Sequence, residues 1–432
     1  MVVPAMPLGG KSGAGIMSNN RIDIPTTARR YDLDWLRVLA FGLLIFYHTG
    51  MLYAERWGFH YKSQYLSSTL EYLMLLSSPW RMLLIWFISG YALGVVLPRV
   101  VSFQQGALFA VRRTVVLLLP LLTGLWLIVP PQLYAEMLQD GAHNVSYRAF
   151  YQAFFDLQHP LFADYQSGVW PHVDVNHLWY LRSLWQFTLL LLLLLLPLLN
   201  LRLVQRATGR LLHLALPWQL LLLTLMLLLI HAIAEGGSRR ELAGFGFLVL
   251  GFLSVHNTMF WQQLGRSVNW LGVLCLLNYL LLLVSYYCSQ HSLPVPWQAL
   301  NQTLLYLSYA TQAVAMTFWL LALAQRFLNR PHPYLALANR AVFPVYLVHQ
   351  SLIIIAALYL TPLALGGPLE ALLVVLFTLL ASASLLLILW RLPLIAPLFG
   401  IKTAKQYPGF WAKAGLAAGL LLVLPLAIEL LL

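Results

Sequence analysis

Apolar segments of membrane-spanning length recur along the whole 432-residue sequence. A helix needs about 20 mostly apolar residues to cross the hydrocarbon core of a bilayer. Eleven segments are candidate spans: Trp35–Ala54, Ser78–Leu97, Thr114–Leu133, Leu178–Leu199, Leu212–Ala234, Leu242–His256, Val268–Tyr287, Trp297–Phe327, Ala336–Leu360, Leu369–Trp390 and Trp411–Leu432. The sixth is short and rich in glycine, which predicts a tilted helix or close packing against a neighbour. The pattern predicts an all-α, polytopic transmembrane helix bundle.

Composition excludes several classes of protein. Hydrophobic residues make up 60% of the chain and charged residues only 9%, whereas soluble domains carry roughly 25% charged residues. A water-soluble globular protein and a disordered chain are therefore excluded. The excess of 26 Lys and Arg over 14 Asp and Glu fits cytoplasmic loops better than a nucleic-acid-binding face. Cys275 and Cys288 lie in or beside apolar segments, which argues against a disulfide framework or a cysteine metal site.

The distribution of basic residues predicts the orientation of the chain. A cytoplasmic N-terminus places most Lys and Arg residues inside and most acidic residues outside, as the positive-inside rule requires. Residues 1–30 lack apolar periodicity and are expected to form a flexible cytoplasmic tail, not a signal peptide. Residues 31–400 are expected to form the membrane domain. Residues 401–432 are expected to add a basic loop and a further transmembrane helix.

The longest loop, residues 134–177, is then extracytoplasmic. It is rich in aromatic and acidic side chains, among them Tyr151, Asp156 and Trp170. Such a loop suits a surface for sugars. It suits equally well a lid that amphipathic aromatic side chains hold at the membrane surface.

Ionisable side chains inside apolar spans mark functional sites in membrane proteins. Arg37 and His48 lie eleven residues apart in the first span. Because eleven steps of about 100° return a helix to within about 20°, both side chains share one face, about 16 Å apart along the axis. An arginine near the cytoplasmic end suits an anionic ligand, and a buried neutral imidazole suits a general base. The alternatives are a basic anchor at the membrane surface and a structural histidine between helices.

The second and third spans add further candidates. Arg81 lies near the outer end of the second span and either contributes to a site or extends to the membrane surface. Ser89, beside Gly90, allows another helix or a ligand to approach the backbone closely. Arg112 and Arg113 open the third span on the cytoplasmic side. This pair suits a phosphate group, although ordinary topology signals explain it equally well.

The fourth span begins with a cluster of polar and aromatic residues directly after the long loop. His177, Trp179 and Arg182 form this cluster. An aromatic belt at the membrane surface explains Trp179 but not the other two. Arg182 needs a carboxylate partner, and Asp174 is the nearest candidate in sequence.

Near the C-terminus, the ninth span places Tyr346 and His349 three residues apart, on one helix face. Their alternative role is packing between helices. No Asp or Glu occupies the middle of any predicted span, which counts against a proton-coupled pump or antiporter. Nucleotide-binding and zinc-protease motifs do not occur either. We expect no metal and no tightly bound cofactor.

Taken together, these segments resemble the acyltransferase-3 family of integral membrane acyltransferases. The resemblance rests on Arg37 and His48 with ten residues between them, Arg81-Met82 with Phe87-Ile-Ser-Gly90, His177-Leu-Trp179, and Tyr346-Leu-Val-His349-Gln350. Their order and spacing agree over residues 35–400, nearly the whole chain. The last two segments, with Arg391-Leu-Pro-Leu-Ile-Ala-Pro-Leu-Phe, look most like the branch that adds succinyl groups to osmoregulated periplasmic glucans. Val116 departs from the pattern, because many members carry a second arginine there.

The resemblance implies about ten core helices, with the eleventh span as an addition. It implies a cytoplasmic acyl-CoA donor, succinyl-CoA or acetyl-CoA, as co-substrate. The acceptor it implies is a hydroxyl group of an exported glycan, and the location is the cell inner (plasma) membrane. The only partners expected are acyl-CoA, the glycan and the lipid bilayer; nucleic acid is not among them, and the sequence leaves the oligomeric state open.

In this interpretation the candidate residues divide into three groups. The donor is bound by Arg37, Arg112, Arg113 and Ser89. His48 acts as general base or carries the acyl group briefly, with Arg37 on the same face. The acceptor or the developing oxyanion is held by Arg81, His177, Trp179, Arg182, Tyr346 and His349. The alternative functions are a transporter or flippase for an anionic or lipid-linked substrate, and a structural or sensory membrane protein.

Overall fold

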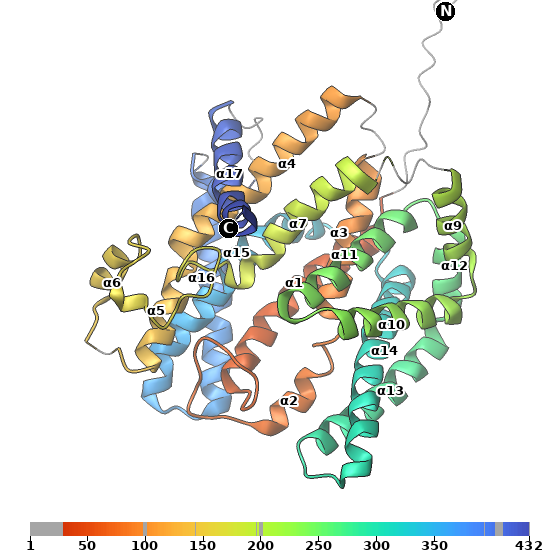
Figure 1. The fold of residues 1–432 in the computed structure, drawn as a ribbon, viewed down its shortest axis with the longest axis horizontal. Helices are drawn as coiled ribbons and strands as arrows, with labels where there is room; N and C mark the ends of the chain where they lie inside the picture. Colours follow the sequence, from red (N-terminus) through yellow and green to blue (C-terminus); the bar gives the residue numbers. More distant parts are fainter. Residues whose placement is uncertain are drawn as a thin grey trace, which may run out of the picture.

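The computed structural model describes residues 29–97, 102–142, 144–195, 197, 202–392, 394–401 and 409–431. Within these ranges the regular secondary structure is helical and includes no strand beyond two isolated bridges, which confirms the all-α fold (Figure 1). The α-helices are α1 Tyr31–Tyr53, α2 Ser68–Met74, α3 Arg81–Val96, α4 Phe103–Thr123, α5 Pro130–Gln139, α6 Tyr147–Ala153, α7 Trp179–Leu190, α9 Arg202–His213, α10 Leu216–Ile233, α11 Gly236–Ser254, α12 Thr258–Arg266, α13 Val268–Ser289, α14 Val295–Phe327, α15 Leu335–Leu360, α16 Gly367–Arg391 and α17 Gly409–Leu431.

Seven of the described helices are long and apolar enough to cross a membrane. They are α1, α10, α13, α14, α15, α16 and the composite helix Phe103–Gln139. The bent pair of α11 and α12, with 106° between its halves, adds an eighth if it counts as one span. The apolar helix α3 has only 16 residues. The chain is therefore a multi-pass membrane protein, while eleven spans and a cytoplasmic N-terminus remain predictions.

Some of the predicted segments fall where the structure is not described. Residues 1–28 of the expected tail lie outside the described residues, and so do residues 402–408 of the basic loop. The same holds for residues 196, 198 and 199 at the end of the fourth predicted span, and for Leu432. The helix α17 covers the rest of the eleventh predicted span and packs against α4.

The third predicted span, Thr114–Leu133, lies within a longer helix. The helix runs from Phe103 to Gln139. Its first turns are polar, so the apolar pattern of the sequence does not indicate them. Ser102 caps this polar start by accepting a hydrogen bond from the Gln105 amide. A π-helical turn at Gly124–Ile128 leads into α5, which begins at Pro130. The helix therefore carries Gln132 past two prolines and into the bundle.

The expected extracytoplasmic loop is partly helical and has an aromatic core of its own. The α6 helix and a 3-10 turn at Pro160–Phe162 lie within it. Phe150 and Phe162 are fully buried, and the His172 ring stacks on Phe162 with 3.9 Å between centroids. Burial lowers the pKa of the His172 imidazole. Many of the aromatic residues that suggested a sugar-binding surface or a lid thus hold this loop together.

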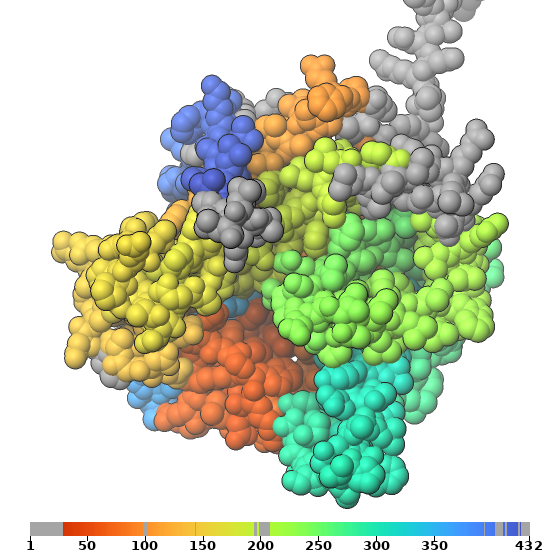
Figure 2. Space-filling view, viewed as in Figure 1, coloured from red at the N-terminus to blue at the C-terminus, as the bar shows by residue number. Residues whose placement is uncertain are grey.

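The first helix lies at the centre of the bundle. It contacts α3, α14, α15 and α16, and in Figure 1 it lies between α15 and α16 on one side and α14 on the other. Any side chain on α1 that points inward therefore meets residues from several spans. The space-filling view shows the same face, with the α1–α2 region in red and orange between the yellow outer loop and the green and teal helices (Figure 2).

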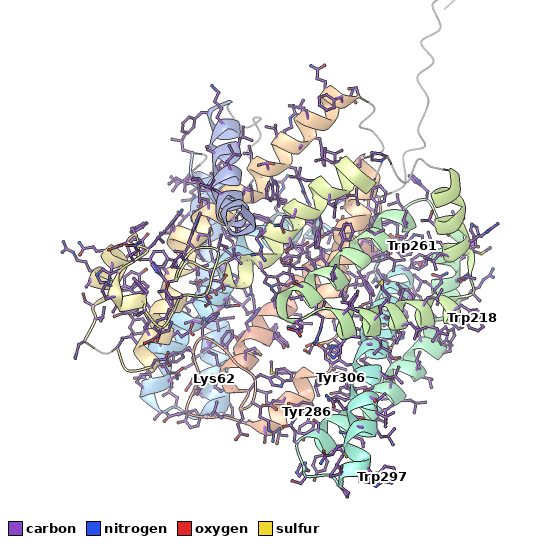
Figure 3. The ribbon with its side chains drawn as sticks, viewed as in Figure 1. Lys62, Trp218, Trp261, Tyr286, Trp297 and Tyr306 are labelled. Carbon is purple, nitrogen blue, oxygen red and sulfur yellow. The ribbon has the colours of Figure 1, made fainter. Side chains whose placement is uncertain are left out.

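Aromatic side chains at the margin of the molecule face away from this core. Trp218 on α10 is 61% exposed and Trp297 on α14 is 58% exposed, and both point outward at the edge of the molecule (Figure 3). Tryptophan is enriched where a protein meets the membrane surface, because its ring is apolar and its N–H is polar. These positions fit the surface of a membrane protein.

Glycines allow α3 and α11 to cross in direct backbone contact. A Cβ atom at Gly90 would lie 1.8 Å from the Leu248 carbonyl oxygen, and one at Gly251 would lie 2.0 Å from the Phe87 oxygen. Only residues without a side chain permit this approach. The predicted tight packing of the glycine-rich sixth span is confirmed, although α11 begins earlier, at Gly236. Ser89 belongs to the α3 segment that this crossing fixes.

We predict that Gly90→Ala and Gly251→Ala separate α3 from α11 and destabilise the protein. The cost of such overpacking is about 1–3 kcal/mol. Gly42→Ala is the matched control, since Gly42 also lies within a helix but a methyl group added there would have no neighbouring atom within 4 Å. It should be neutral or stabilising by about 0.5–1 kcal/mol. Thermal unfolding in detergent, followed by size-exclusion chromatography, measures all three variants. Equal melting temperatures would contradict the prediction.

Candidate functional site

Three histidines from separate parts of the sequence meet inside the bundle. The His48 ring on α1 lies 5.2 Å from the His349 ring on α15, centroid to centroid. The His177 ring lies 5.3 Å from the same His349 ring; it belongs to a 3-10 turn, Asn176–Leu178, just before α7. The structure thus brings together His48, His177 and His349, which the sequence suggested one at a time.

The hydrogen bonds of His177 fix its proton. Its Nδ1 atom accepts from the Gln132 side-chain amide at 3.2 Å, and its Nε2 atom donates to the Leu347 carbonyl oxygen at 3.0 Å. Both nitrogens are therefore occupied in the neutral ring. The Tyr346 hydroxyl donates to the His177 carbonyl oxygen at 2.6 Å. His177 and Tyr346 hold each other in place within the protein.

His349 has one bonded nitrogen and one free nitrogen. Its Nδ1 atom lies 2.6 Å from the Tyr346 carbonyl oxygen and must donate to it, because a carbonyl only accepts. The Nε2 atom then carries the lone pair of the neutral ring, and it is buried without a hydrogen-bond partner. The Nδ1 atom of His48 is likewise buried and unpartnered. Each of these two neighbouring rings therefore has a buried nitrogen that is free to exchange a proton with a bound substrate.

Gln132 on α5 supports the histidines from behind. Its amide nitrogen also donates to the Ser351 hydroxyl at 2.7 Å, and its oxygen accepts from the Gln350 amide at 2.9 Å. Gln132 is completely buried. Sequence reasoning missed it because its amide is not ionisable, although a polar residue at the end of an apolar span was a usable signal.

Arg37 and His48 both face α15, as their spacing predicts. The Arg37 guanidinium donates to the Asn339 side-chain oxygen through Nε at 3.0 Å and through a second, shorter bond. Arg37 thus meets the start of α15 and His48 meets its middle. Asn339 is a second residue that sequence reasoning missed, since it lies at the edge of a span.

Aromatic rings fill the space between these two ends. The Phe41 ring on α1 lies 5.3 Å from the Tyr346 ring and 6.0 Å from the Tyr180 ring, centroid to centroid. The Tyr180 hydroxyl lies 2.5 Å from the Ser89 hydroxyl. An apolar, aromatic wall therefore connects the Arg37 end to the His48 end.

The two adjacent arginines of α4 differ in exposure. Arg113 is half-buried, whereas Arg112 is exposed. Arg113 and Arg37 both lie within electrostatic range of the Tyr180 hydroxyl. The structure therefore places Arg113 near the Arg37 end of the site. Val115, beside the apolar Val116, is covered by Gly415 of α17.

Arg81 points into the bundle. Its guanidinium lies flat over the Tyr47 ring, 3.3 Å from the ring centroid, and its Nε atom is buried without a hydrogen-bond partner. It also lies within electrostatic range of His48. A cation held on an aromatic face near the histidine pair is able to stabilise negative charge there.

The expected partner of Arg182 is wrong. Arg182 pairs with Glu241 of α11 at 2.8 Å, and not with Asp174. Asp174 accepts a hydrogen bond from the neighbouring Val175 amide instead. Trp179 carries the guanidinium of Arg240 on its ring, 3.7 Å from the centroid. Within the described ranges, no group of three or more His, Cys, Asp and Glu side chains is arranged to hold a metal ion.

We predict that Gln132→Leu destabilises the protein by about 2 kcal/mol or more, because buried polar groups of His177 and Gln350 lose their partner. The matched control is Gln298→Leu, whose exposed side chain bonds the Leu293 carbonyl oxygen at the surface. Chemical or thermal unfolding in detergent should separate the two variants by several degrees. Similar stabilities would mean that the Gln132 bonds contribute nothing net.

Most of the chain matches a known protein family. Residues 30–390 match the Acyl_transf_3 family model, which is described as an acyltransferase domain. No curated protein matches this chain, and no solved structure does. The matched range contains the histidine cluster, Arg37 and the helices α1 to α15, and it covers well over half of the sequence. The chain belongs to the acyltransferase-3 family and is a membrane acyltransferase.

Proposed function

We propose that this acyltransferase moves an acyl group from cytoplasmic acyl-CoA to a hydroxyl group of an exported glycan. The observation that carries the proposal is the pair of neighbouring imidazole rings of His48 and His349, each with a buried nitrogen that has no hydrogen-bond partner. A general base needs a free lone pair within reach of the hydroxyl it deprotonates. Both rings offer one, at the end of an aromatic wall that begins at Arg37.

The donor end of the site carries uncompensated positive charge. Among the described residues, Arg37 and Arg113 form no ion pair with a carboxylate, whereas Arg29 and Arg30 are paired with Asp34 and Asp32. Two partly buried guanidinium groups without counter-ions favour an anionic ligand such as the phosphates of CoA. The acyl arm of CoA would then extend along the aromatic wall toward His48. Ser89 and the exposed Arg112 complete the proposed donor-binding set.

At the His48 end, the groups present are sufficient for the proton transfers that acyl transfer needs. His48 takes the proton of the acceptor hydroxyl while the oxygen attacks the thioester carbonyl. Arg81 stabilises the oxyanion, and the C–S bond then breaks as His48 returns the proton to the leaving sulfur. The same residue also has the geometry to carry the acyl group as an acyl-imidazole before the acceptor arrives. His349 keeps a second proton-accepting nitrogen beside the reacting atoms.

The remaining candidates shape the acceptor side. The polar groups of His177 and Tyr346 are used within the protein, so we propose that they fix the His349 backbone and ring instead of binding sugar directly. Trp179 and Arg182, with Arg240 and Glu241, form the acceptor-facing rim. Because Arg182 is already paired with Glu241, Arg81 is the better partner for a succinyl carboxylate. A cytoplasmic donor and an exported acceptor require an enzyme in the inner (plasma) membrane, which is the location we propose. Because the sequence resembles the succinyl-transferring branch, succinyl-CoA is the first donor to test.

We predict that His48→Ala leaves a folded protein whose acyl transfer falls about a hundredfold or more, the usual loss of a general base. Purified protein is given succinyl-CoA or acetyl-CoA with a soluble glucan oligosaccharide. Free CoA thiol and the acylated glucan are measured together. His291→Ala serves as the control, because His291 lies in an exposed turn after α13.

Two results would overturn parts of this proposal. Normal transfer by the His48→Ala variant would remove His48 from the reaction. A folded wild-type protein that releases no thiol from either donor would instead support a transporter or flippase for an anionic substrate.

We also predict that Arg37→Ala raises the KM for acyl-CoA about tenfold with little change in kcat, because it removes a charge-assisted contact to phosphate. The control is Arg29→Ala, an exposed cation two residues before the start of the same helix. Acyl-pantetheine, which lacks the nucleotide phosphates, should show no difference between wild type and Arg37→Ala. If KM stays unchanged while Arg37→Ala and Asn339→Ala lose equal thermal stability, Arg37 is a structural anchor.

A further inference from the structure

An aromatic side chain from the loop that follows α1 lies beside the His48 ring. The Phe59 ring lies 5.9 Å from the His48 ring, centroid to centroid, with 24° between the ring planes. Phe59 is half-buried, and the next residue, His60, lies within electrostatic range of His48. Resting on the proposed function, we infer that Phe59 determines acceptor specificity by excluding water from the catalytic pair.

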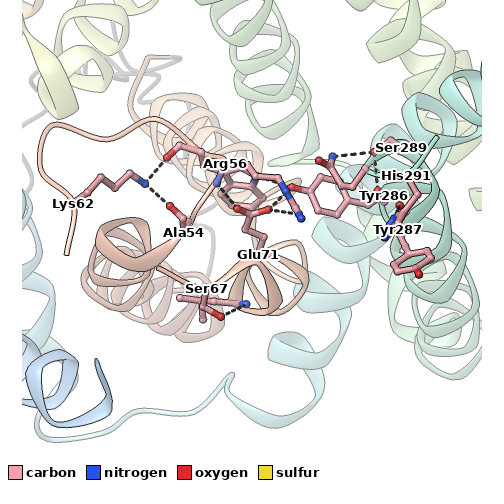
Figure 4. A network of polar contacts seen from close by, with 12 residues as sticks. Ala54, Arg56, Lys62, Ser67, Glu71, Tyr286, Tyr287, Ser289 and His291 are labelled. Atoms are coloured by element: carbon pink, nitrogen blue, oxygen red, sulfur yellow. Dashed lines mark hydrogen bonds and ion pairs between the residues drawn. The ribbon is translucent and has the colours of Figure 1, made fainter. Parts of the chain in front are cut away.

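The loop that carries Phe59, residues 55–66, is fastened to the end of α1. The Lys62 ammonium donates to the carbonyl oxygens of Met51 at 2.8 Å and Trp57. It also donates to the Ala54 carbonyl oxygen at 2.6 Å (Figure 4). Burial lowers the pKa of this ammonium, and the three carbonyls compensate for its lost hydration. The last turn of a helix has carbonyl groups without hydrogen-bond partners. A cation there gives these carbonyls a donor and gains acceptors for its own N–H groups.

A second set of contacts fastens the same loop to α5. The Lys62 amide donates to the Gln139 side chain at 2.8 Å, and the Gln139 amide donates to the Lys62 carbonyl oxygen at 2.8 Å. His60 lies 2.7 Å from the Glu136 carboxylate. Gln132, which supports the histidine cluster, belongs to this helix. The loop is thus tied to the two helices that supply His48 and Gln132.

A third set holds the loop toward α2 and α13. Arg56 pairs with the buried Glu71 carboxylate at 3.2 Å, and the Tyr286 hydroxyl donates to the same carboxylate at 2.6 Å (Figure 4). The Trp57 indole in turn donates to the Tyr286 hydroxyl at 3.0 Å. With contacts in three directions, the position of Phe59 over His48 is set by the loop and not by the ring alone.

The chemical consequence concerns the competition between water and the glycan. Water and a sugar hydroxyl offer the same reacting group to His48, so the base cannot distinguish them. With water, the acyl C–S bond breaks and an acyl C–O bond forms, and the water proton passes through His48 to the sulfur; the products are a free acid and a thiol. A closed site prevents this wasteful hydrolysis. A bulky ring over the imidazole denies water a resting place while leaving the acceptor to displace it.

The test measures thiol release from succinyl-CoA and acetyl-CoA without any acceptor. We expect Phe59→Ala to raise this release about fivefold or more, with Phe59→Leu in between because leucine keeps apolar bulk. Lys62→Met should raise it too, since it frees the loop from α1. Leu66→Ala is the matched control, a 47% exposed apolar residue of the same loop. The double variant His48→Ala/Phe59→Ala should lose the release, which shows that the hydrolysis uses the same site.

The outcomes separate this inference from the proposed function. The inference is overturned if thiol release is unchanged in both Phe59→Ala and Lys62→Met while these variants still acylate the glucan oligosaccharide. That result leaves the proposed function intact. A parallel loss of hydrolysis and transfer in Phe59→Ala, with normal values in Lys62→Met, overturns it as well, because that pattern indicates a structural role. Wild-type protein and variants that release no thiol from either donor overturn the proposed function and the inference with it.

Discussion

Gln132 holds together three segments that are remote in sequence, and the site depends on the bonds it makes. Its single amide contacts His177 before α7, and Ser351 and Gln350 on α15. Inside a bilayer no water replaces a missing partner, so these bonds fix the helices relative to one another. They also determine which nitrogen atoms of the histidine cluster stay without a hydrogen bond. Once His177 and the His349 Nδ1 atom are satisfied, the free imidazole nitrogens of the cluster belong to His349 and His48.

The rest of the site follows from how α1 and α15 run side by side. Arg37 meets Asn339 and His48 meets His349, so the two helices are parallel and carry paired residues at both ends of the site. Arg37 and Arg113 lie at one end of the site, and the histidines lie at the other end with Arg81 near them. The rings of Phe41, Tyr180 and Tyr346 separate them. A thioester donor has this same division, with its phosphates distant from the reacting carbonyl.

The sequence predicted the fold class and part of the site for clear physical reasons. Apolar segments predict the spans because a helix that crosses lipid must be apolar. The Arg37–His48 spacing predicts a shared face because helical geometry is regular. The interaction partners of single side chains could not be predicted in the same way. Arg182 lies nearer to Asp174 in sequence than to Glu241 but pairs with the latter, since helix packing decides which carboxylate is close. Neither Gln132 nor Asn339 is ionisable, so neither stands out in an apolar span. The polar start of α4 was missed because hydropathy does not register a helix that extends beyond the membrane.

The loop beside His48 is held by two of the helices that build the site. Its anchors lie on α1, which carries His48, and on α5, which carries Gln132. The loop that carries Phe59 is therefore connected to both helices that position the site. A cover that hung free would open with each fluctuation and admit water to the thioester. In the proposed function, an acceptor would therefore displace Phe59 by rotation of its side chain and not by opening of the loop. Under the proposed function, the site then selects the acceptor by its shape and not by its chemical reactivity.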